Sequence, residues 1–352
     1  MSKIVAIAAG GTGGHINAAL SLGEYFKKND FNPVYFTGTR YLDYQLFKGC
    51  ASKVFHLKSR PLRSKNPLRI FYNLILNFVV FLGVLLSMLK ARPLCVLGAG
   101  GYVCGPTMVA AKLLGVKCYI VEQNAVAGLT NKLLSKISDK VFVNFENTKG
   151  IKKDSKLVVS GNPVRSSIQY TTNALEEELK ILVFGGSLGA KQINDAFFYL
   201  VQKHWNKKLH IIHQVGKNNL KELCVSDSVR YEQHEYLNNM DELYGWANII
   251  VCRAGASTIS ELRVAKRPSI IVPYPFATDD HQTHNATELA NEECFYVNVI
   301  DHKQSTETIV KDIESAIKEI LEKNLFSPFK ECANVDASKL IYEKVISDVR
   351  NK

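Results

Sequence analysis

Acidic residues are scarce in the front half of the 352-residue chain. Residues 1–165 hold 7 Asp and Glu against 23 Lys and Arg, and no acidic residue lies between Asp43 and Glu122. The remaining residues hold 26 acidic and 21 basic side chains, so the formal net charge of +11 comes from the front half alone. A surface this basic is expected to meet an anionic partner.

Charge is also absent from residues 70–89, IFYNLILNFVVFLGVLLSML, which as a helix would extend about 30 Å, enough to cross a bilayer. A mildly polar stripe interrupts its apolar surface, formed by Asn66, Arg69, Asn73, Asn77, Val80, Val84 and Ser87. The segment could be buried on a sheet, span a bilayer, or lie in the bilayer interface with its outward face in lipid. We expect the interfacial helix, because the segment is flanked by basic residues suited to anionic headgroups: Lys58, Arg60, Arg63, Lys65, Arg69, Lys90 and Arg92.

Several common signals are missing. The start, MSKIVAIAAGG, lacks a cationic segment followed by a long apolar stretch and a cleavage site, so we expect no export signal. The eight cysteines include no C-x-x-C pair, so we expect a reduced, cytosolic chain without a structural metal. No glycine run has the i, i+2, i+5 spacing of a dinucleotide fingerprint or the lysine of a phosphate loop, which disfavours dehydrogenases and nucleotide triphosphatases.

Strand-like apolar runs alternate with helical patterns along both halves, from KIVAIAA near the start to SIIVPY near residue 270. The runs lack period-two alternation, which is typical of parallel strands buried on both faces. The sequence therefore predicts two doubly wound α/β domains, joined within residues 158–180, VVSGNPVRSSIQYTTNALEEELK.

Three glycine-rich turns follow predicted strands, at residues 10–15, 98–106 and 185–189. A helix that starts after such a turn offers backbone N–H groups and the positive end of its dipole to an anion. One turn alone can serve packing only, but three, divided between two halves, favour phosphorylated ligands, and two of them.

His15 follows the first glycine turn and is expected in the first turn of a helix. The positive helix end should lower the pKa of the imidazole, so that the neutral form, which suits a general base, dominates at pH 7. The alternative is a histidine that merely caps its helix.

The second half contains side chains that could bind the hydroxyl groups of a sugar. Glu261 lies in the helix expected after a strand that ends at Cys252. Its carboxylate could accept hydrogen bonds from two ribose hydroxyls, or it could merely complement the helix dipole. Side chains of Asp279, Asp280, His281, Gln282, His284 and Asn285 gather after another strand, and amides both donate and accept. A metal site there is disfavoured, because no second cluster completes it.

The motifs GGTGGH, GAGGYVCGP, EQNAVAGLTNKLL, SGNPVR, GGSLGA, HQVGK, CRAGASTISEL and DDHQTHNA follow one another from residue 4 to about residue 290. Their order and spacing resemble those of the MurG glycosyltransferases. The resemblance implies a GT-B fold of two Rossmann-like domains facing across a cleft. It implies inverting transfer of N-acetylglucosamine from UDP-GlcNAc to undecaprenyl-pyrophosphoryl-MurNAc-pentapeptide (lipid I), forming lipid II for peptidoglycan. It implies no required cofactor or metal, in keeping with the lack of a D-x-D motif.

The resemblance assigns residues 1–163 to an acceptor-lipid and membrane-docking domain and residues 164–352 to a UDP-GlcNAc-binding domain, and leaves open whether the last helix returns to the first. It implies a peripheral protein on the cytoplasmic face of the inner membrane, with cell-wall synthesis and division proteins as further partners. No nucleic-acid partner is expected, because the basic half carries a long apolar helix and lacks interleaved aromatic platforms.

By matching motif, His15 would be the base that deprotonates the acceptor's 4-hydroxyl. The residues implied to bind UDP-GlcNAc are Thr12, Gly13, Gly14, Asn124, Arg165, Ser187, Leu237, Ala256, Ser257, Thr258, Ile259, Ser260, Glu261 and Gln282. Those implied for the acceptor and the membrane are Lys58, Arg60, Arg63, Lys65, Arg69, Gly100, Gly101 and Tyr102.

The sequence departs from the family pattern at Ala18, Val121, Leu188 and His281. Leu188 replaces a glutamine and removes one amide near the donor diphosphate. A glycosyltransferase acting on diacylglycerol or another lipid is the alternative enzyme, and sugar transfer to diacylglycerol but not to lipid I would favour it.

Overall fold

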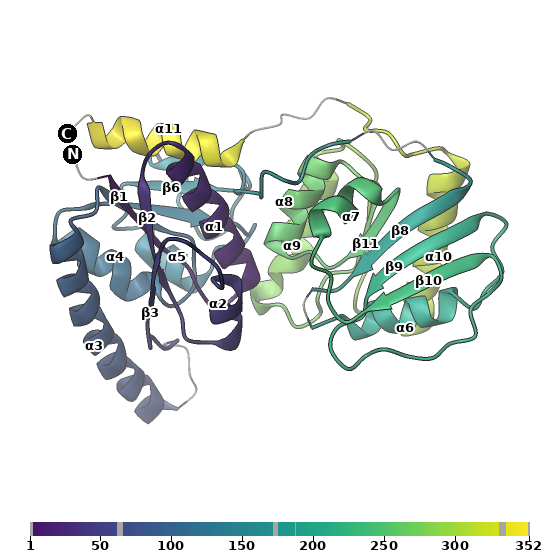
Figure 1. Ribbon diagram of the computed structural model, residues 1–352, viewed down its shortest axis with the longest axis horizontal. Helices are drawn as coiled ribbons and strands as arrows, with labels where there is room; N and C mark the ends of the chain where they lie inside the picture. The colour runs from purple at the N-terminus through teal and green to yellow at the C-terminus, as the bar shows by residue number, and fades with distance from the viewer. Residues whose placement is uncertain (1–2, 62–65, 172–174, 187, 331–335, 351–352) are drawn as a thin grey trace. The chain divides into compact units, whose positions relative to one another are not determined.

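The computed structural model describes residues 3–61, 66–171, 175–186, 188–330 and 336–350. It divides into two compact units, one formed by Met1–Arg165 with Val335–Lys352 and the other by Ser166–Asn334 (Figure 1). Each unit is an α/β layer structure with its own core.

The first unit contains a parallel sheet of seven strands in the order β3-β2-β1-β4-β5-β6-β7. The strands are β1 (Ile4–Ala8), β2 (Asn32–Thr37), β3 (Lys53–His56), β4 (Cys95–Gly98), β5 (Lys117–Glu122), β6 (Lys140–Val143) and β7 (Leu157–Val159). Val5 of the central strand pairs with Pro33 on one side and Cys95 on the other. The strand order reverses between β1 and β4, and ligands of open α/β sheets bind at such a reversal.

Helices cover both faces of this sheet, namely α1 (Gly13–Lys28), α2 (Tyr41–Leu46), α3 (Pro67–Ala91), α4 (Cys104–Leu113), α5 (Leu129–Leu134) and α11 (Ala337–Arg350). Apolar residues of α1 and α11 pack on one face, and those of α3, α4 and α5 pack on the other. The Tyr119 hydroxyl donates to Asp348 at 2.6 Å, which joins β5 to α11. The last helix of the chain thus belongs to the first unit.

The uncharged segment forms α3, a 25-residue helix that is long and apolar enough, by length and composition alone, to cross a membrane. The middle of its mildly polar stripe faces inward: Asn73 and Val84 are buried, whereas Asn66 and Arg69 at its start are exposed. The Asn73 amide donates to Pro61 O, and Asn77 bonds to both the N–H and the carbonyl of Arg60. The apolar remainder of the helix surface is therefore turned outward.

The second unit contains a parallel sheet of six strands in the order β10-β9-β8-β11-β12-β13. The strands are β8 (Glu178–Phe184), β9 (Lys208–Gln214), β10 (Val229–His234), β11 (Ile249–Cys252), β12 (Ser269–Ile271) and β13 (Val297–Val299). The order reverses between β8 and β11, as it does between β1 and β4 in the first unit. Both sheets confirm the prediction of two doubly wound α/β domains.

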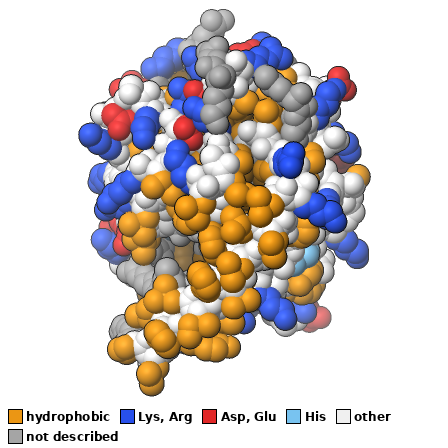
Figure 2. All heavy atoms as spheres, turned by 90° about the vertical axis from the view of Figure 1, so that its left-hand side faces the viewer, with side chains coloured by type: hydrophobic (Ala, Val, Ile, Leu, Met, Phe, Trp, Pro, Cys, Tyr) orange, Lys and Arg blue, Asp and Glu red, His pale blue; other side chains and the backbone are white. Residues whose placement is uncertain are grey.

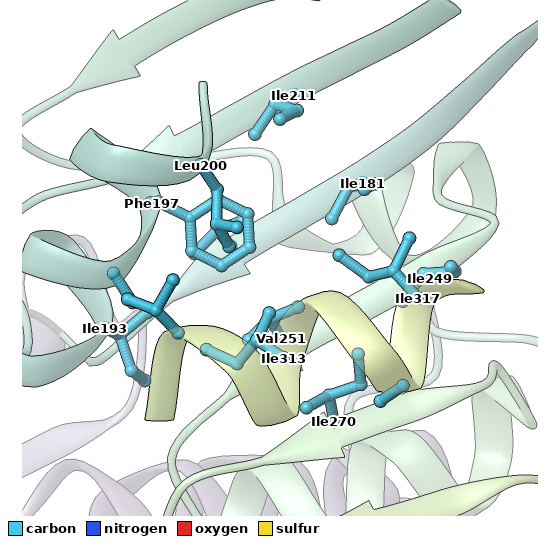
Figure 3. Packing of buried hydrophobic residues seen from close by; sticks show 14 of the residues in the cluster. Ile181, Ile193, Phe197, Leu200, Ile211, Ile249, Val251, Ile270, Ile313 and Ile317 are labelled. Atoms are coloured by element: carbon cyan, nitrogen blue, oxygen red, sulfur yellow. The ribbon is translucent and has the colours of Figure 1, made fainter. Parts of the chain in front are cut away.

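The helices of the second unit are α6 (Lys191–Leu200), α7 (Met240–Trp246), α8 (Ala256–Ala265), α9 (His281–Asn291) and α10 (Thr306–Glu322), with a short 3-10 helix at Thr278–Asp280. Figure 3 shows the core on one face of the sheet, where Ile193 and Phe197 of α6 meet Ile313 and Ile317 of α10. The other face is covered by α7, α8 and α9 (Figure 1).

One cysteine differs from the expectation of a reduced chain. Among the residues that the structure describes, six cysteines are free thiols, and burial raises the pKa of Cys104 and Cys118 to about 12, so these two stay protonated and pack as apolar groups. Cys294 is disulfide-bonded, so the expectation of a fully reduced chain is wrong there. Sequence spacing does not show which cysteines the fold brings together.

Candidate active site

Two glycine turns meet at the strand reversal of the first unit. The turn after β1 and the turn after β4 are joined by a hydrogen bond from Gly10 N to Gly100 O at 3.2 Å. Gly101 has φ +88°, and a Cβ there would overlap the Gly10 carbonyl oxygen. Only glycine allows this approach. The structure thus brings together two of the three glycine turns identified in the sequence.

His15 lies in the first turn of α1, which begins at Gly13. The N-cap is Thr12, whose hydroxyl accepts from His15 N at 3.4 Å, so the imidazole is not the cap. His15 Nδ1 lies 3.1 Å from Gly10 O. Because a carbonyl oxygen only accepts, Nδ1 carries the proton of a neutral ring and Nε2 carries the lone pair. A Cβ on Gly100 would lie 2.8 Å from Nε2, so the turn after β4 closes on this edge of the ring.

Arg40 and Asp43, which belong to none of the motifs in the sequence, hold the first turn in place. The Asp43 carboxylate is buried and accepts from Gly11 N at 3.1 Å and Arg40 N at 2.9 Å. The Arg40 guanidinium donates to Gly11 O at 3.3 Å and lies 5.1 Å from the centre of the Tyr102 ring. A fixed cation therefore stands between the two glycine turns. The signal in the sequence was a strand that runs directly into GTRYLD.

Asn124 is positioned by a buried carboxylate. Glu122, at the end of β5, accepts from the backbone and amide N–H groups of Asn124 at 2.9 and 3.2 Å, and also from Gly128 N and Asn131. The neighbouring Gln123 amide donates to Ala99 O at 2.8 Å, in the turn after β4. Asn124 thus lies beside the turns that hold His15 and Gly101.

In the second unit the glycine turn after β8 is tied to two other loops. The Gln214 amide donates to Gly186 O at 2.8 Å and accepts from Leu237 N at 2.9 Å. Leu237, implied to bind uracil through its backbone, therefore lies close to the glycine turn. Ser187 lies outside the described residues.

The segment Ala256 to Glu261 forms the first turns of α8. The Glu261 carboxylate is 8% exposed and accepts from the Tyr244 hydroxyl at 2.9 Å. The side chains of Ile259 and Ser260 are buried. The Ser257 hydroxyl oxygen is buried and has no hydrogen-bond partner among the described residues. A buried hydroxyl without a partner carries a desolvation cost, which a bound ligand would relieve.

Gln282 lies beside the start of α8. Its amide oxygen accepts from Ala254 N at 3.2 Å and Tyr274 N at 3.0 Å, which directs the NH2 group away as a donor. Arg253, which the motif analysis did not single out, is buried and donates to Val272 O and Pro273 O at 2.9 and 2.7 Å. Burial lowers the pKa of Arg253 to about 10. It remains charged at neutral pH and joins the loops after β11 and β12.

The other predicted residues are more dispersed. Arg165 ends the first segment of the first unit. Lys58, Arg60 and Arg69 are exposed beside α3, whereas Arg63 and Lys65 lie outside the described residues. Within the part of the chain that the structure describes, no group of three or more His, Cys, Asp and Glu side chains could hold a metal ion.

The chain was compared with protein-family models and with known proteins. Residues 5–143 match the glycosyltransferase family 28 N-terminal domain, and residues 180–344 match its C-terminal domain. A Myxococcus xanthus protein named UDP-N-acetylglucosamine--N-acetylmuramyl-(pentapeptide) pyrophosphoryl-undecaprenol N-acetylglucosamine transferase is 35% identical over 83% of this chain and 78% of its own. A Geobacter sulfurreducens protein of the same name is 31% identical over 98% and 99%. The crystal structure of Acinetobacter baumannii MurG matches with a TM-score of 0.76 and 26% identity over 98% of this chain and 99% of that one.

The chain belongs to the MurG family. It has the GT-B fold, with one Rossmann-like sheet in each unit. Two of its departures from the family pattern, Ala18 and Val121, are buried and affect packing. Leu188 is 85% exposed at the glycine turn, and His281 contacts Thr278 O through Nδ1 at 2.8 Å. None of these four residues replaces a side chain that is described above at either strand reversal.

Proposed function

We propose that the protein transfers N-acetylglucosamine from UDP-GlcNAc to undecaprenyl-pyrophosphoryl-MurNAc-pentapeptide, forming lipid II. The observation that carries the proposal is the membership of the MurG family, together with a histidine of defined tautomer at one strand reversal and hydrogen-bonded loops, including a glycine turn, at the other. The first unit takes the acceptor lipid, and the second takes UDP-GlcNAc.

His15 is the general base of this proposal. Its Nδ1–H is held by the Gly10 carbonyl, so Nε2 can accept the proton of the acceptor's 4-hydroxyl. The hydroxyl oxygen then forms a bond to the anomeric carbon as the bond to the UDP oxygen breaks, which inverts α to β. The electron pair of the broken bond leaves on the diphosphate.

The donor diphosphate is held in the second unit. The turn at Gly186 and the first turn of α8 present backbone N–H groups at neighbouring strand ends, where they stabilise the negative charge that grows on the leaving group. Glu261 binds the ribose hydroxyls with the help of Tyr244, and Gln282 donates to hydroxyls of the transferred sugar.

Arg40 binds the acceptor's pyrophosphate. Its guanidinium is held against Gly11 and Tyr102 beside the turn that carries His15. Planar guanidinium groups suit phosphate oxygens. Gly100, Gly101 and Tyr102 complete the acceptor side, because the turn that they form packs closely against Gly10 and His15.

The outer surface of α3 docks on the membrane. Ten large apolar side chains of α3 are at least 42% exposed, among them Leu68 at 80% and Leu86 at 67%. Figure 2 shows hydrophobic side chains gathered on this face, with Lys and Arg at its margins. A contiguous apolar patch formed by ten large side chains is typical of an interaction site. Lys58, Arg60 and Arg69 lie nearby, and each basic residue adds about 1 kcal/mol near an anionic bilayer.

Adsorption is a better proposal for α3 than spanning. Val84 and Met88 are 1% exposed within the core of the first unit, and Asn73 and Asn77 hold the backbone of residues 60 and 61. A spanning helix would lose these contacts and would leave two amides in lipid. We therefore propose a peripheral protein on the cytoplasmic face of the cell membrane.

Product analysis tests the proposed function. The purified protein is incubated with labelled UDP-GlcNAc and either lipid I or diacylglycerol in detergent. Label is expected in lipid I only, as a β-linked disaccharide lipid. Label in diacylglycerol with none in lipid I would establish the alternative acceptor, and label in neither would overturn the proposal.

A further inference from the structure

The HQVG segment, residues 213–216, has no role in the proposed function so far, although its Gln214 contacts two loops of the site. It lies at the carboxyl end of β9, and β9 lies between β8 and β10 in the sheet. The loop after β8 carries the glycine turn, and the loop after β10 carries Leu237. The segment therefore lies between the loop that the proposed function assigns to the diphosphate and the loop of Leu237, which the resemblance implies to bind uracil.

Gln214 joins these two loops through one side chain. It is 4% exposed, its Nε2 donates to Gly186 O at 2.8 Å, and its Oε1 accepts from Leu237 N at 2.9 Å. An amide suits this position, because it donates at one end and accepts at the other. Loss of the amide would leave two backbone groups to find other partners.

Backbone contacts reinforce the link. Gly189 and Gly216 have φ of +76° and +88°. A Cβ on Gly189 would overlap the Val215 carbonyl, and a Cβ on Gly216 would overlap the Leu188 carbonyl. The segment after β9 and the glycine turn after β8 are thus in direct backbone contact, so a shift in one moves the other.

A buried chain of hydrogen bonds fixes the Val215 carbonyl. Asn194 Nδ2 donates to Val215 O at 2.8 Å, so its Oδ1 is the acceptor that faces His213 Nε2 at 3.2 Å. His213 must therefore carry its proton on Nε2 and accept from the Tyr231 hydroxyl at Nδ1, 2.8 Å away. Burial lowers the pKa of His213 to about 3, so the ring stays neutral.

We propose that Gln214 is a positioning residue of the donor site, which sets the distance between the diphosphate turn and the uracil loop, while the Tyr231–His213–Asn194 chain holds the adjoining carbonyl in place. The inference rests on the proposed binding of UDP-GlcNAc to the second unit. Gln214 acts on the donor through Gly186 and Leu237 and does not touch the reacting atoms.

Gln214→Met tests the role, because methionine has nearly the same shape and neither donates nor accepts strongly. The KM for UDP-GlcNAc and the Kd for UDP by calorimetry are expected to rise about tenfold, the size expected when two backbone groups lose their partners. The KM for lipid I should change little, whereas the melting temperature should fall, because the same two backbone groups lose their partners in the folded protein. The control is Gln233→Met, which removes an amide that likewise bonds to both backbone groups of Lys221, and its Kd for UDP should match wild type.

Two results distinguish failure of the positioning role from failure of the proposed function. If wild type binds UDP and Gln214→Met binds it equally tightly, the positioning role is overturned while the proposed function stands. If wild type binds neither UDP nor UDP-GlcNAc, the proposed function fails first. Should Gln214→Met not fold, Gln214→Asn takes its place: the shorter amide can reach only one loop, so a weaker Kd for UDP supports the role and an unchanged Kd overturns it.

Discussion

A single carbonyl decides which nitrogen of the candidate base is basic. Gly10 O can only accept a hydrogen bond, so the 3.1 Å contact with His15 Nδ1 leaves the lone pair on Nε2. The same logic assigns His213 the opposite tautomer, because its Nε2 faces an acceptor oxygen of Asn194. The two histidines thus carry the proton on different ring nitrogens, because their hydrogen-bond partners differ.

Arg40 supplies a test of the acceptor side. Arg40→Met is expected to raise the KM for lipid I about tenfold and to leave the KM for UDP-GlcNAc unchanged, because a charge-assisted contact to the pyrophosphate is lost. Initial rates at varied acceptor concentration measure this. Arg230→Met, an exposed arginine of the second unit, is the control and should behave as wild type. An unchanged acceptor KM in the Arg40 variant would remove Arg40 from the acceptor site.

Residues that follow glycine turns could be predicted from the sequence, but the residues that hold those turns could not. His15 was placed in a first helical turn because the helix begins where the glycine run ends. Asp43 and Gln214 were missed because their partners are far away in the chain: Gly11 lies 32 residues from Asp43, and Gly186 lies 28 residues from Gln214. Such contacts depend on strand order, which no local pattern shows.

At the scale of the element, α3 shows why a hydrophobic pattern does not reveal which face is buried. The stripe that packs inward is the more polar one, because Asn73 and Asn77 bond to the backbone of residues 60 and 61. An ordinary amphipathic helix would bury its apolar side. The inversion is what leaves the apolar surface outward and supports docking on lipid.

Membrane docking is tested by replacing two exposed aromatic residues of α3. Phe71→Ser combined with Phe78→Ser should weaken binding to vesicles of anionic phospholipid by about a hundredfold or more, since each buried Phe contributes about 1.5–3 kcal/mol. Both side chains are at least 60% exposed, so the fold should persist. Vesicle sedimentation measures the effect, and Phe329→Ser in the second unit is the control. Equal sedimentation of the double variant and wild type would argue against this surface.

Asp139 gives the first unit a pH-dependent contact. Burial disfavours its charge, but the Cys118 N–H and the ammonium groups of Lys112 and Lys117 outweigh burial and lower the pKa of the carboxyl. A lowered pKa contributes stability above the unfolded pKa of about 4, and that stability is lost as the pH falls through the folded value.

Asp139→Asn should therefore destabilise the protein by about 1 kcal/mol at pH 7, where the ionised group is replaced. The difference from wild type should shrink as the pH falls below about 4, because protonated Asp139 resembles asparagine. Urea unfolding across this pH range measures the change, with Asp154→Asn, an exposed aspartate of the same unit, as control. A difference that stays constant between pH 7 and pH 3 would exclude the ion pairs as its source.

At the scale of the whole molecule, the two α/β units were predictable because parallel strands buried on both faces leave continuous apolar runs. The return of α11 to the first unit was not, although Ile341, Val345 and Val349 recur at helical spacing. Spacing identifies an amphipathic helix but does not say which of two sheets it covers. The disulfide at Cys294 escaped prediction for the same reason.

The assignment of the base to the first unit and of UDP-GlcNAc binding to the second is tested most directly by the kinetics of two variants in the lipid I assay. His15→Ala should lower kcat by about 10²–10⁴-fold with little change in the KM for UDP-GlcNAc, because it removes only the base. Glu261→Ala should instead raise the KM for UDP-GlcNAc about tenfold, because it removes the ribose ligand. A His15→Ala enzyme with near-normal kcat, or a Glu261→Ala enzyme with an unchanged KM for UDP-GlcNAc, would contradict these roles.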